Sequence, residues 1–169
     1  MKTAQQQVTI QVPVDKVWSA ISQLDKAAEQ NAEVTKSLYI SEKTSGVGTK
    51  RMMEQKNGKI QMDHVVIDWQ EGKKITMEST RVEGLPIVKD RITLEVSPQG
   101  EATQLKVIYS YQFKGLASLF AGNKTVEKGL RKSVLSCKHH FETGEAVDNQ
   151  LYKQKIAPKY KSLNTSVNS

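Results

Sequence analysis

Two tyrosines in the last third of the chain are the first residues whose type and spacing suggest a chemical role. Apolar and polar residues alternate here, so one face of a predicted strand carries Leu105, Val107, Tyr109, Tyr111 and Phe113. A buried tyrosine combines an apolar ring with a hydroxyl that needs a hydrogen-bond partner. The two rings suit an amphipathic ligand held by a curved sheet. They equally suit a filled core in which each hydroxyl bonds within the protein.

Cys137, His139 and His140 form a second group with chemical potential, on one predicted helix. Cys137 and His140 share a helix face while His139 points away, and no cluster of acidic or cysteine partners accompanies them. A zinc site needs three or four ligands, so we expect no metal. Cys137 lies in mid-helix without an evident base, which argues against a nucleophile. The sequence has no nucleophile elbow, phosphate-binding loop or dinucleotide fingerprint, so no cofactor is expected and catalytic residues stay unassigned.

Length and composition limit the class of protein. A chain of 169 residues with 37% hydrophobic and 25% charged residues is typical of one globular domain with a core. One cysteine allows no intrachain disulfide, and no apolar run approaches the roughly 18–20 residues that span a bilayer. The first residues lack a continuous apolar stretch, so we expect no signal peptide and a cytoplasmic location.

The net charge of +7 is unevenly distributed. From Gly115 onward, nine basic residues face four acidic ones, which gives +5 of the +7. We interpret this excess mainly as a solvated helix face. A weak contact of the basic C-terminal region with anionic surfaces is the alternative, and no nucleic acid is expected.

The first element changes from strand to helix within a few residues. Val8, Ile10 and Val12 alternate with polar residues as in a half-buried strand, and Pro13 then interrupts the ladder. The apolar residues that follow have helical spacing and include an aromatic anchor: Val14, Val17, Trp18, Ile21 and Leu24. A second short helix or irregular link is expected over residues 25–34.

The rest of the chain predicts six further strands and a long helix. The strands are expected at 34–42, 49–55, 60–68, 75–81, 90–96 and 104–113, with Asn57-Gly58 at the tip of a type I′ hairpin. Helical spacing from Val126 to Gly144 predicts an amphipathic helix over 124–147, preceded by a helical turn at 115–122. We expect residues 1–161 to form one domain and residues 162–169 to form a disordered tail.

This order resembles the START-like, or Bet v 1-like, superfamily, because the segments that carry the likeness follow one another as in that family. They are VPVDKVWSAI, GVGTKRMME, DHVVIDWQEGKKI and GLPIVKDRITLEVSPQGEATQLKVIYSYQF, and they are most similar to bacterial polyketide cyclase/dehydrase-type proteins. The resemblance implies an α+β helix-grip fold. In that fold a curved antiparallel sheet of about seven strands wraps around a long C-terminal helix, with two short helices after the first strand. Trp18 would then plug one end of the interior.

The resemblance also implies that Arg51 points inward with Met53. A buried guanidinium needs an acid, a water network or an anionic ligand. Asp63, across the predicted hairpin, is the natural acid, so we expect an Arg51–Asp63 pair or a polar clamp for a ligand. Val65 and Val66 are both apolar, which leaves the phase of this strand open, and the reversed phase puts His64 inside.

We therefore expect a module that binds or transports a small hydrophobic or amphipathic molecule between sheet and helix. The alternative is a polyketide cyclase/dehydratase-like enzyme acting on such a molecule. The candidate ligand-binding residues are Arg51, Met53, Asp63, Val65, Leu85, Val107, Tyr109, Tyr111, Phe113, Leu130 and Val134.

Overall fold

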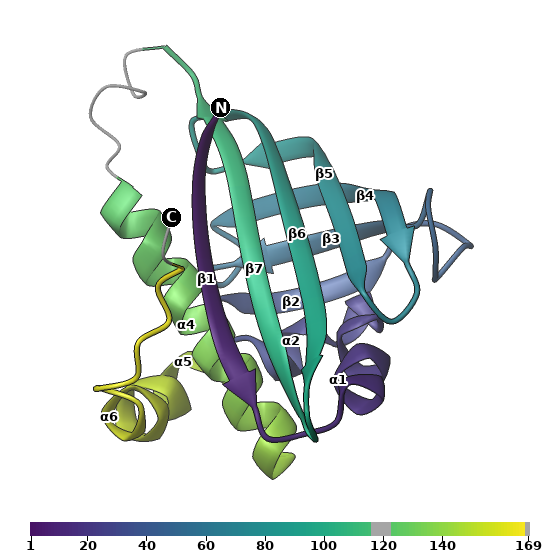
Figure 1. Ribbon diagram of the computed structural model, residues 1–169. Helices are drawn as coiled ribbons and strands as arrows, with labels where there is room; N and C mark the ends of the chain where they lie inside the picture. The colour runs from purple at the N-terminus through teal and green to yellow at the C-terminus, as the bar shows by residue number, and fades with distance from the viewer. Residues whose placement is uncertain (116–122, 168–169) are drawn as a thin grey trace.

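Seven antiparallel strands form one curved sheet in a computed structural model that describes residues 1–115 and 123–167 (Figure 1). Their order is β1-β7-β6-β5-β4-β3-β2. The strands are β1 Lys2–Ile10, β2 Val34–Tyr39, β3 Lys50–Gln55, β4 Ile60–Gln70, β5 Lys74–Glu83, β6 Ile87–Gln99 and β7 Ala102–Phe113. Asn57 and Gly58 have φ values of 55° and 82° at the β3–β4 turn, as a type I′ turn requires. The predicted helix-grip sheet is confirmed.

Pro13 separates β1 from α1 (Val14–Ile21), which turns beneath the end of the sheet. Trp18 is 6% exposed, and its indole N–H donates to the Glu71 carboxylate at 2.6 Å. Trp69 donates to the second oxygen of Glu71 at 2.8 Å, and the two indole rings pack edge to face. This arrangement confirms the predicted plug. A 3-10 turn, η1 (Leu24–Lys26), and α2 (Ala27–Gln30) form the expected link to β2.

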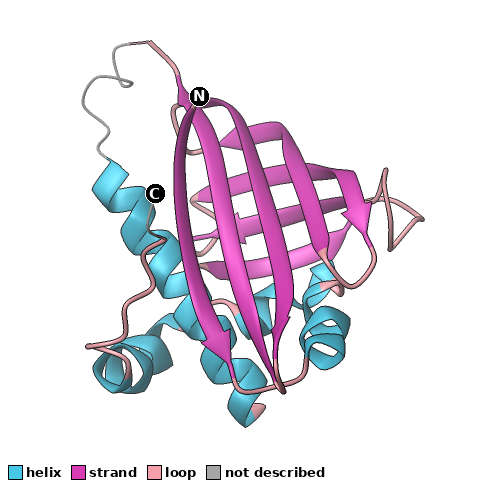
Figure 2. Cartoon of the chain, in the orientation of Figure 1, coloured by secondary structure: helices cyan, strands magenta, loops and turns pink. Residues whose placement is uncertain are grey.

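The long helix α4 spans Asn123–Thr143 and packs against β1 and β7 on the concave side of the sheet (Figure 2). Its buried apolar residues include Leu130, Val134 and Leu135. The helix ends four residues before the predicted position, because Gly144 adopts a left-handed φ of 75° and returns its N–H to a carbonyl of the last turn. The predicted turn at 115–122 lies, from residue 116 on, outside the described residues.

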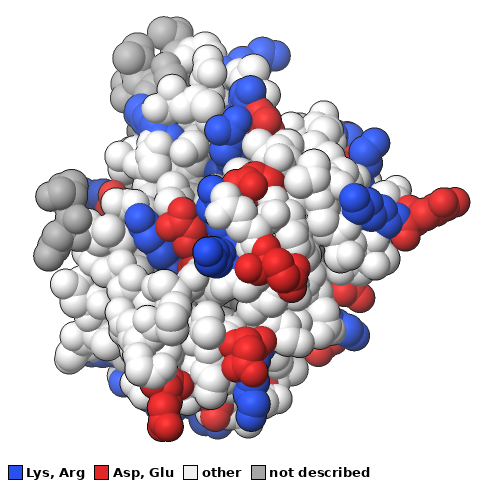
Figure 3. Space-filling view, turned by 45° about the vertical axis from the view of Figure 1, so that its right-hand side comes forward, with Lys and Arg blue, Asp and Glu red and all other residues white. Residues whose placement is uncertain are grey.

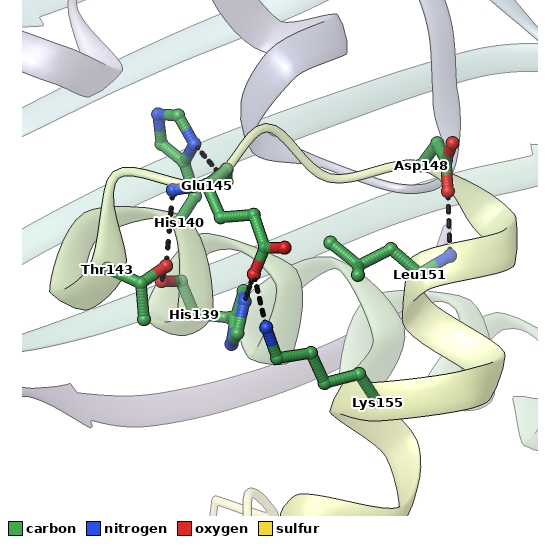
Figure 4. Close-up of polar contacts among 7 residues, drawn as sticks. All are labelled: His139, His140, Thr143, Glu145, Asp148, Leu151 and Lys155. Carbon is green, nitrogen blue, oxygen red and sulfur yellow. Dashed lines mark hydrogen bonds and ion pairs between the residues drawn. The ribbon is translucent and has the colours of Figure 1, made fainter.

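Residues 145–167, here called the C-terminal clasp, fold back along α4. The clasp contains α5 (Asn149–Leu151), a π-helical turn η2 (Tyr152–Ile156) and α6 (Ala157–Lys159). Figure 4 shows its first contact: the Glu145 carboxylate lies between His139 Nε2, at 2.7 Å, and Lys155 Nζ, at 2.8 Å.

The end of the clasp reaches the edge strand β1. Thr165 is 1% exposed, its carbonyl accepts the Gln7 N–H at 2.8 Å, and its hydroxyl bonds to the Gln6 side chain. The predicted disordered tail is therefore wrong for residues 162–167. The polar composition misled that prediction, because this segment is held by backbone carbonyls and hydroxyls rather than by apolar side chains.

Candidate functional site

Alternating burial shows which side of the sheet faces α4, here called the inner face. In β4 the buried residues Ile60, Met62, His64 and Val66 alternate with more exposed ones. Val66 packs in the same apolar cluster as Val134 of α4, which sets the direction of that face. His64 therefore points into the interior between sheet and helix.

A row of polar side chains crosses the inner face, one from each of five neighbouring strands. Arg51 of β3 stands opposite His64 of β4, which stands opposite Ser79 of β5. Asp90 of β6 donates its backbone N–H to the Ser79 hydroxyl at 3.2 Å. Tyr109 of β7 donates its hydroxyl to an Asp90 carboxylate oxygen at 2.9 Å. We call these five residues the inner polar row.

His64 and Asp90 meet across the intervening strand β5, where the small Ser79 leaves room for both side chains. His64 Nε2 lies 3.6 Å from Asp90 Oδ1, and the two side chains are 2% and 0% exposed. Burial lowers the pKa of His64, although Asp90 opposes the shift, so the imidazole is neutral at pH 7. Burial alone would raise the pKa of Asp90, but His64 and Tyr109 outweigh it and keep the carboxylate ionised. A neutral imidazole thus faces an ionised carboxylate.

Arg51 occupies the β3 end of the row and is 5% exposed. One guanidinium nitrogen, Nη1, donates to the Leu24 carbonyl at 3.4 Å. The buried Nε has no hydrogen-bond partner among the described residues. Burial lowers the pKa of Arg51 to about 10, which the phenol of Tyr39 opposes, and the side chain remains a cation at neutral pH.

The row separates two apolar clusters. The main cluster lies toward α1 and α4 and includes Val66, Met77 and Leu105. The smaller cluster contains four buried residues, Val34, Met53, Ile60 and Met62, with Leu85 among the side chains packed on it. Polar atoms flanked on both sides by apolar side chains can orient an amphipathic molecule, because its polar atoms find partners only in the row.

Three buried atoms of the row have no hydrogen-bond partner within the described part of the chain. They are Arg51 Nε, His64 Nδ1 and Asp90 Oδ1. Folded proteins satisfy nearly all buried polar atoms, so three open ones on a single face need an explanation. The arrangement can bind a donor or acceptor, and the neutral His64 can also accept a proton.

The predicted Arg51–Asp63 pair is wrong, although Arg51 is buried as expected. Asp63 lies on the other face of β4 and bonds to Arg81 at 3.3 Å. Val65 is on the same outer face as Asp63, so neither residue lines the interior. The reversed phase is the correct one and puts His64 inside.

The other predicted lining residues lie on the inner side of the fold. Val107, Tyr111, Leu130 and Val134 are buried in the main cluster, with Tyr109 and Phe113 partly buried against it. Met53 and Leu85 belong to the smaller cluster. Tyr111 donates its hydroxyl to Asn123 of α4 at 2.7 Å, so this tyrosine is satisfied within the protein. Their role as ligand contacts stays a prediction.

Sequence reasoning did not identify Ser79 and Asp90. A signal for Asp90 was present, because it shares a strand face with Ile92, Leu94 and Val96, and a carboxylate on an otherwise apolar face stands out. Ser79 carried no signal in the sequence. Its role is to be small where the longer side chains of His64 and Asp90 meet across β5.

Charges of both signs are interspersed on the surface shown in Figure 3. Several of the C-terminal basic residues are paired: Lys132 with Glu33 and Lys138 with Glu142, both at 2.6 Å. The predicted contact with anionic surfaces stays a prediction. No helix in residues 1–115 and 123–167 is both long and apolar enough to cross a bilayer.

Comparison with known proteins agrees with this architecture. The fold is similar to XoxI from Bacillus cereus, with a TM-score of 0.69 at 12% identity over 83% of this chain and 96% of that one. It is also similar to a START superfamily protein from Mycobacterium smegmatis, with a TM-score of 0.66 at 13% identity over 85% and 96% of the two chains. Ara h 8.0201 gives a TM-score of 0.64 at 14% identity over 83% and 97%.

Family membership follows from the sequence match. Among curated proteins, no sequence matches this chain. A family model described as polyketide cyclase / dehydrase and lipid transport matches residues 1–142. Its fold is the one seen in the START superfamily protein and in Ara h 8.0201, and the chain belongs to the polyketide cyclase/dehydrase and lipid transport family.

Proposed function

We propose that this protein binds a small amphipathic molecule between the sheet and α4. The apolar part of the molecule packs on the clusters that flank the inner polar row, and its polar atoms bond to the row. The observation that carries this proposal is the set of three unpartnered buried atoms on Arg51, His64 and Asp90.

Energetics support a ligand at these atoms. Each buried donor or acceptor without a partner costs about 1–3 kcal/mol, which is a large part of the stability of a small domain. A protein that keeps three such atoms on one face gains this energy back when a ligand supplies the partners. The partly exposed inner-face residues Ile92, Tyr109 and Phe113 offer apolar contact beside them.

A dye experiment tests this proposal. N-phenyl-1-naphthylamine, a neutral dye that fluoresces in apolar surroundings, is expected to bind in equimolar amount and to be displaced by 1-octanol. Ile92→Trp fills space on the inner face and should weaken binding about tenfold. Arg91→Trp places the same ring on the outer face of the same strand and should leave binding unchanged. A folded protein that takes up no dye contradicts the proposal.

The ligand itself can be sought directly. Native mass spectrometry of protein purified from its own host should show a mass increment that disappears on denaturation. The Ile92→Trp variant should carry less of this increment than the Arg91→Trp variant, because only the first substitution faces the interior.

The His64–Asp90 contact favours a second candidate, an enzyme that transfers protons on the bound molecule. The neutral imidazole can accept a proton at Nδ1, and Asp90 stabilises the imidazolium that forms. Deuterium exchange into the acidic C–H positions of 2-tetralone tests this candidate. Exchange that is faster with wild type than with His64→Gln favours it, and equal rates exclude this role for His64.

A further inference from the structure

Arg51 carries a positive charge that no acidic side chain in residues 1–115 and 123–167 balances within 4.0 Å. The undescribed residues 116–122 have the sequence LASLFAG, which contains no acid. Removing a cation from water without a counter-charge costs several kcal/mol, and natural proteins rarely accept this away from functional sites. The uncompensated charge is thus a second feature of the row, separate from its open hydrogen bonds.

The acids of the neighbouring strands β4 and β6 are committed elsewhere. Asp90 bonds to Tyr109 at 2.9 Å and faces His64 at 3.6 Å. Asp63 lies on the outer face with Arg81. Burial is the main cause of the lowered pKa of Arg51, and the one group that opposes it is the phenol of Tyr39 rather than a carboxylate.

The free edge of the Arg51 guanidinium has the shape that a carboxylate needs. The Leu24 carbonyl accepts a hydrogen bond from Nη1. Nε is buried without a partner, and neither Nε nor Nη2 has a hydrogen bond to any described residue. Nε and Nη2 lie on the same side of the planar group, and together they form the fork that accepts two carboxylate oxygens in parallel.

We propose that the amphipathic ligand carries one carboxylate, which pairs with the Nε–Nη2 edge of Arg51. This inference rests on the proposed function and specifies the ligand class as a small apolar acid. A single negative charge fits better than a phosphate, because Arg51 is the only cation in the row and His64 is neutral there. The chain of the acid would extend over the neighbouring apolar clusters.

A pair of competitors that differ only in the head group tests the charge. The experiment measures how strongly octanoate and 1-octanol each displace N-phenyl-1-naphthylamine. It uses wild type, Arg51→Met and Arg51→Lys. A site without a cation prefers the alcohol, because the carboxylate loses more hydration on burial. Wild type is expected to prefer octanoate by about tenfold or more.

The variants separate charge from shape. Arg51→Met should lose the preference for octanoate, because its affinity for octanoate falls by a larger factor than its affinity for 1-octanol. Arg51→Lys keeps the charge without the fork and should retain part of the preference. Arg81→Met, on the outer face, is the matched control and should behave as wild type.

The possible outcomes distinguish the two proposals. If wild type binds the dye but prefers 1-octanol, or if Arg81→Met changes the preference as much as Arg51→Met does, the carboxylate inference is wrong and the binding function stands. If folded wild type binds neither dye nor competitor, the proposed function fails and the inference falls with it.

Discussion

Two arginines in this molecule have opposite surroundings. Arg131 of α4 donates to the carbonyls of Leu163 and Tyr160, at 2.6 and 3.0 Å, and to the Thr165 hydroxyl at 2.9 Å. Arg51 is more deeply buried, yet its one hydrogen bond within the described residues measures 3.4 Å. The arginine with the greater need for partners has fewer of them.

Two buried histidines repeat the contrast. His139 is 1% exposed and bonds at 2.7 Å to Glu145, which also receives Lys155 (Figure 4). His64 is 2% exposed and faces Asp90 at 3.6 Å, beyond ordinary hydrogen-bond length. Among the described residues, His139 Nδ1 and the Tyr160 hydroxyl also lack partners, but the clasp closes its ion pairs and main-chain contacts, whereas the inner polar row leaves three buried atoms open on one face.

We interpret this difference as one between polar groups that hold the structure together and polar groups that serve the proposed ligand. A satisfied polar network fixes the position of a chain segment, and the clasp does this for residues beyond the family match, which ends at residue 142. An open network stores unfavourable energy that a ligand can release. The inner polar row lies within the family match. Substitutions in the two regions should therefore change stability in opposite directions.

The largest effect is expected for Arg131→Ala. The substitution removes three hydrogen bonds from a charged donor, and the free energy of unfolding should fall by about 3 kcal/mol. Urea denaturation measures the change. Arg91→Ala, which removes an exposed guanidinium, is the control and should change stability by about 0.5 kcal/mol or less. A loss below about 1 kcal/mol for Arg131→Ala would mean that the clasp is not held by this residue.

Arg51→Met should raise the free energy of unfolding of ligand-free protein by about 1–2 kcal/mol. The substitution replaces an uncompensated buried charge with an apolar side chain of similar volume. Leu24 O keeps a partner in this variant, since the Ser37 hydroxyl also donates to it at 2.7 Å. The same urea titration applies. A destabilisation like that of Arg131→Ala would show that Arg51 has protein partners as good as those in the clasp.

His64 should make stability depend on pH. Its pKa is lowered in the folded protein, mainly by burial and further by Arg51, so the unfolded chain takes up the proton first. Stability should therefore fall as the pH drops below about 6.5, by at most about 2 kcal/mol at about pH 5. His64→Met should lack this part of the decline, and Arg51→Met should reduce it. Parallel pH curves for wild type and His64→Met would contradict the prediction.

The fold could be predicted because its signals are local and repeated. Alternation along β7, the Asn57-Gly58 turn and the helical spacing around Trp18 each indicate one element, and their order indicates the family. Glu71 shows the limit of such signals: nothing in its neighbourhood reveals that its carboxylate receives two indole N–H groups from different elements.

The site was only partly predictable, because it depends on register. A shift of one residue exchanges the two faces of a strand, and the β4–β5 pairing has such a shift between Asp63 and His64. The apolar pair Val65 and Val66 conceals which phase is real. The clasp was missed for another reason: Arg131 binds main-chain carbonyls, which leave no trace in the sequence.

The smallest effect, and the most specific test of the clasp, is expected at Thr165. Thr165→Val keeps the shape but removes the hydroxyl that bonds to the buried Gln6 side chain, so stability should fall by about 1 kcal/mol. Gln6→Leu alone should also be unfavourable, since it leaves the Thr165 hydroxyl one acceptor fewer. The double variant removes both groups, and its loss should be smaller than the sum of the two single losses.

The Gln7 amide, which donates to Thr165 O at 2.8 Å, should remain protected from hydrogen exchange in the double variant, because that backbone bond does not involve either side chain. Additive losses, together with rapid exchange at Gln7 in the wild type, would show that the end of the clasp does not rest on β1. The contrast between a closed clasp and an open interior would then fail at its most distal contact.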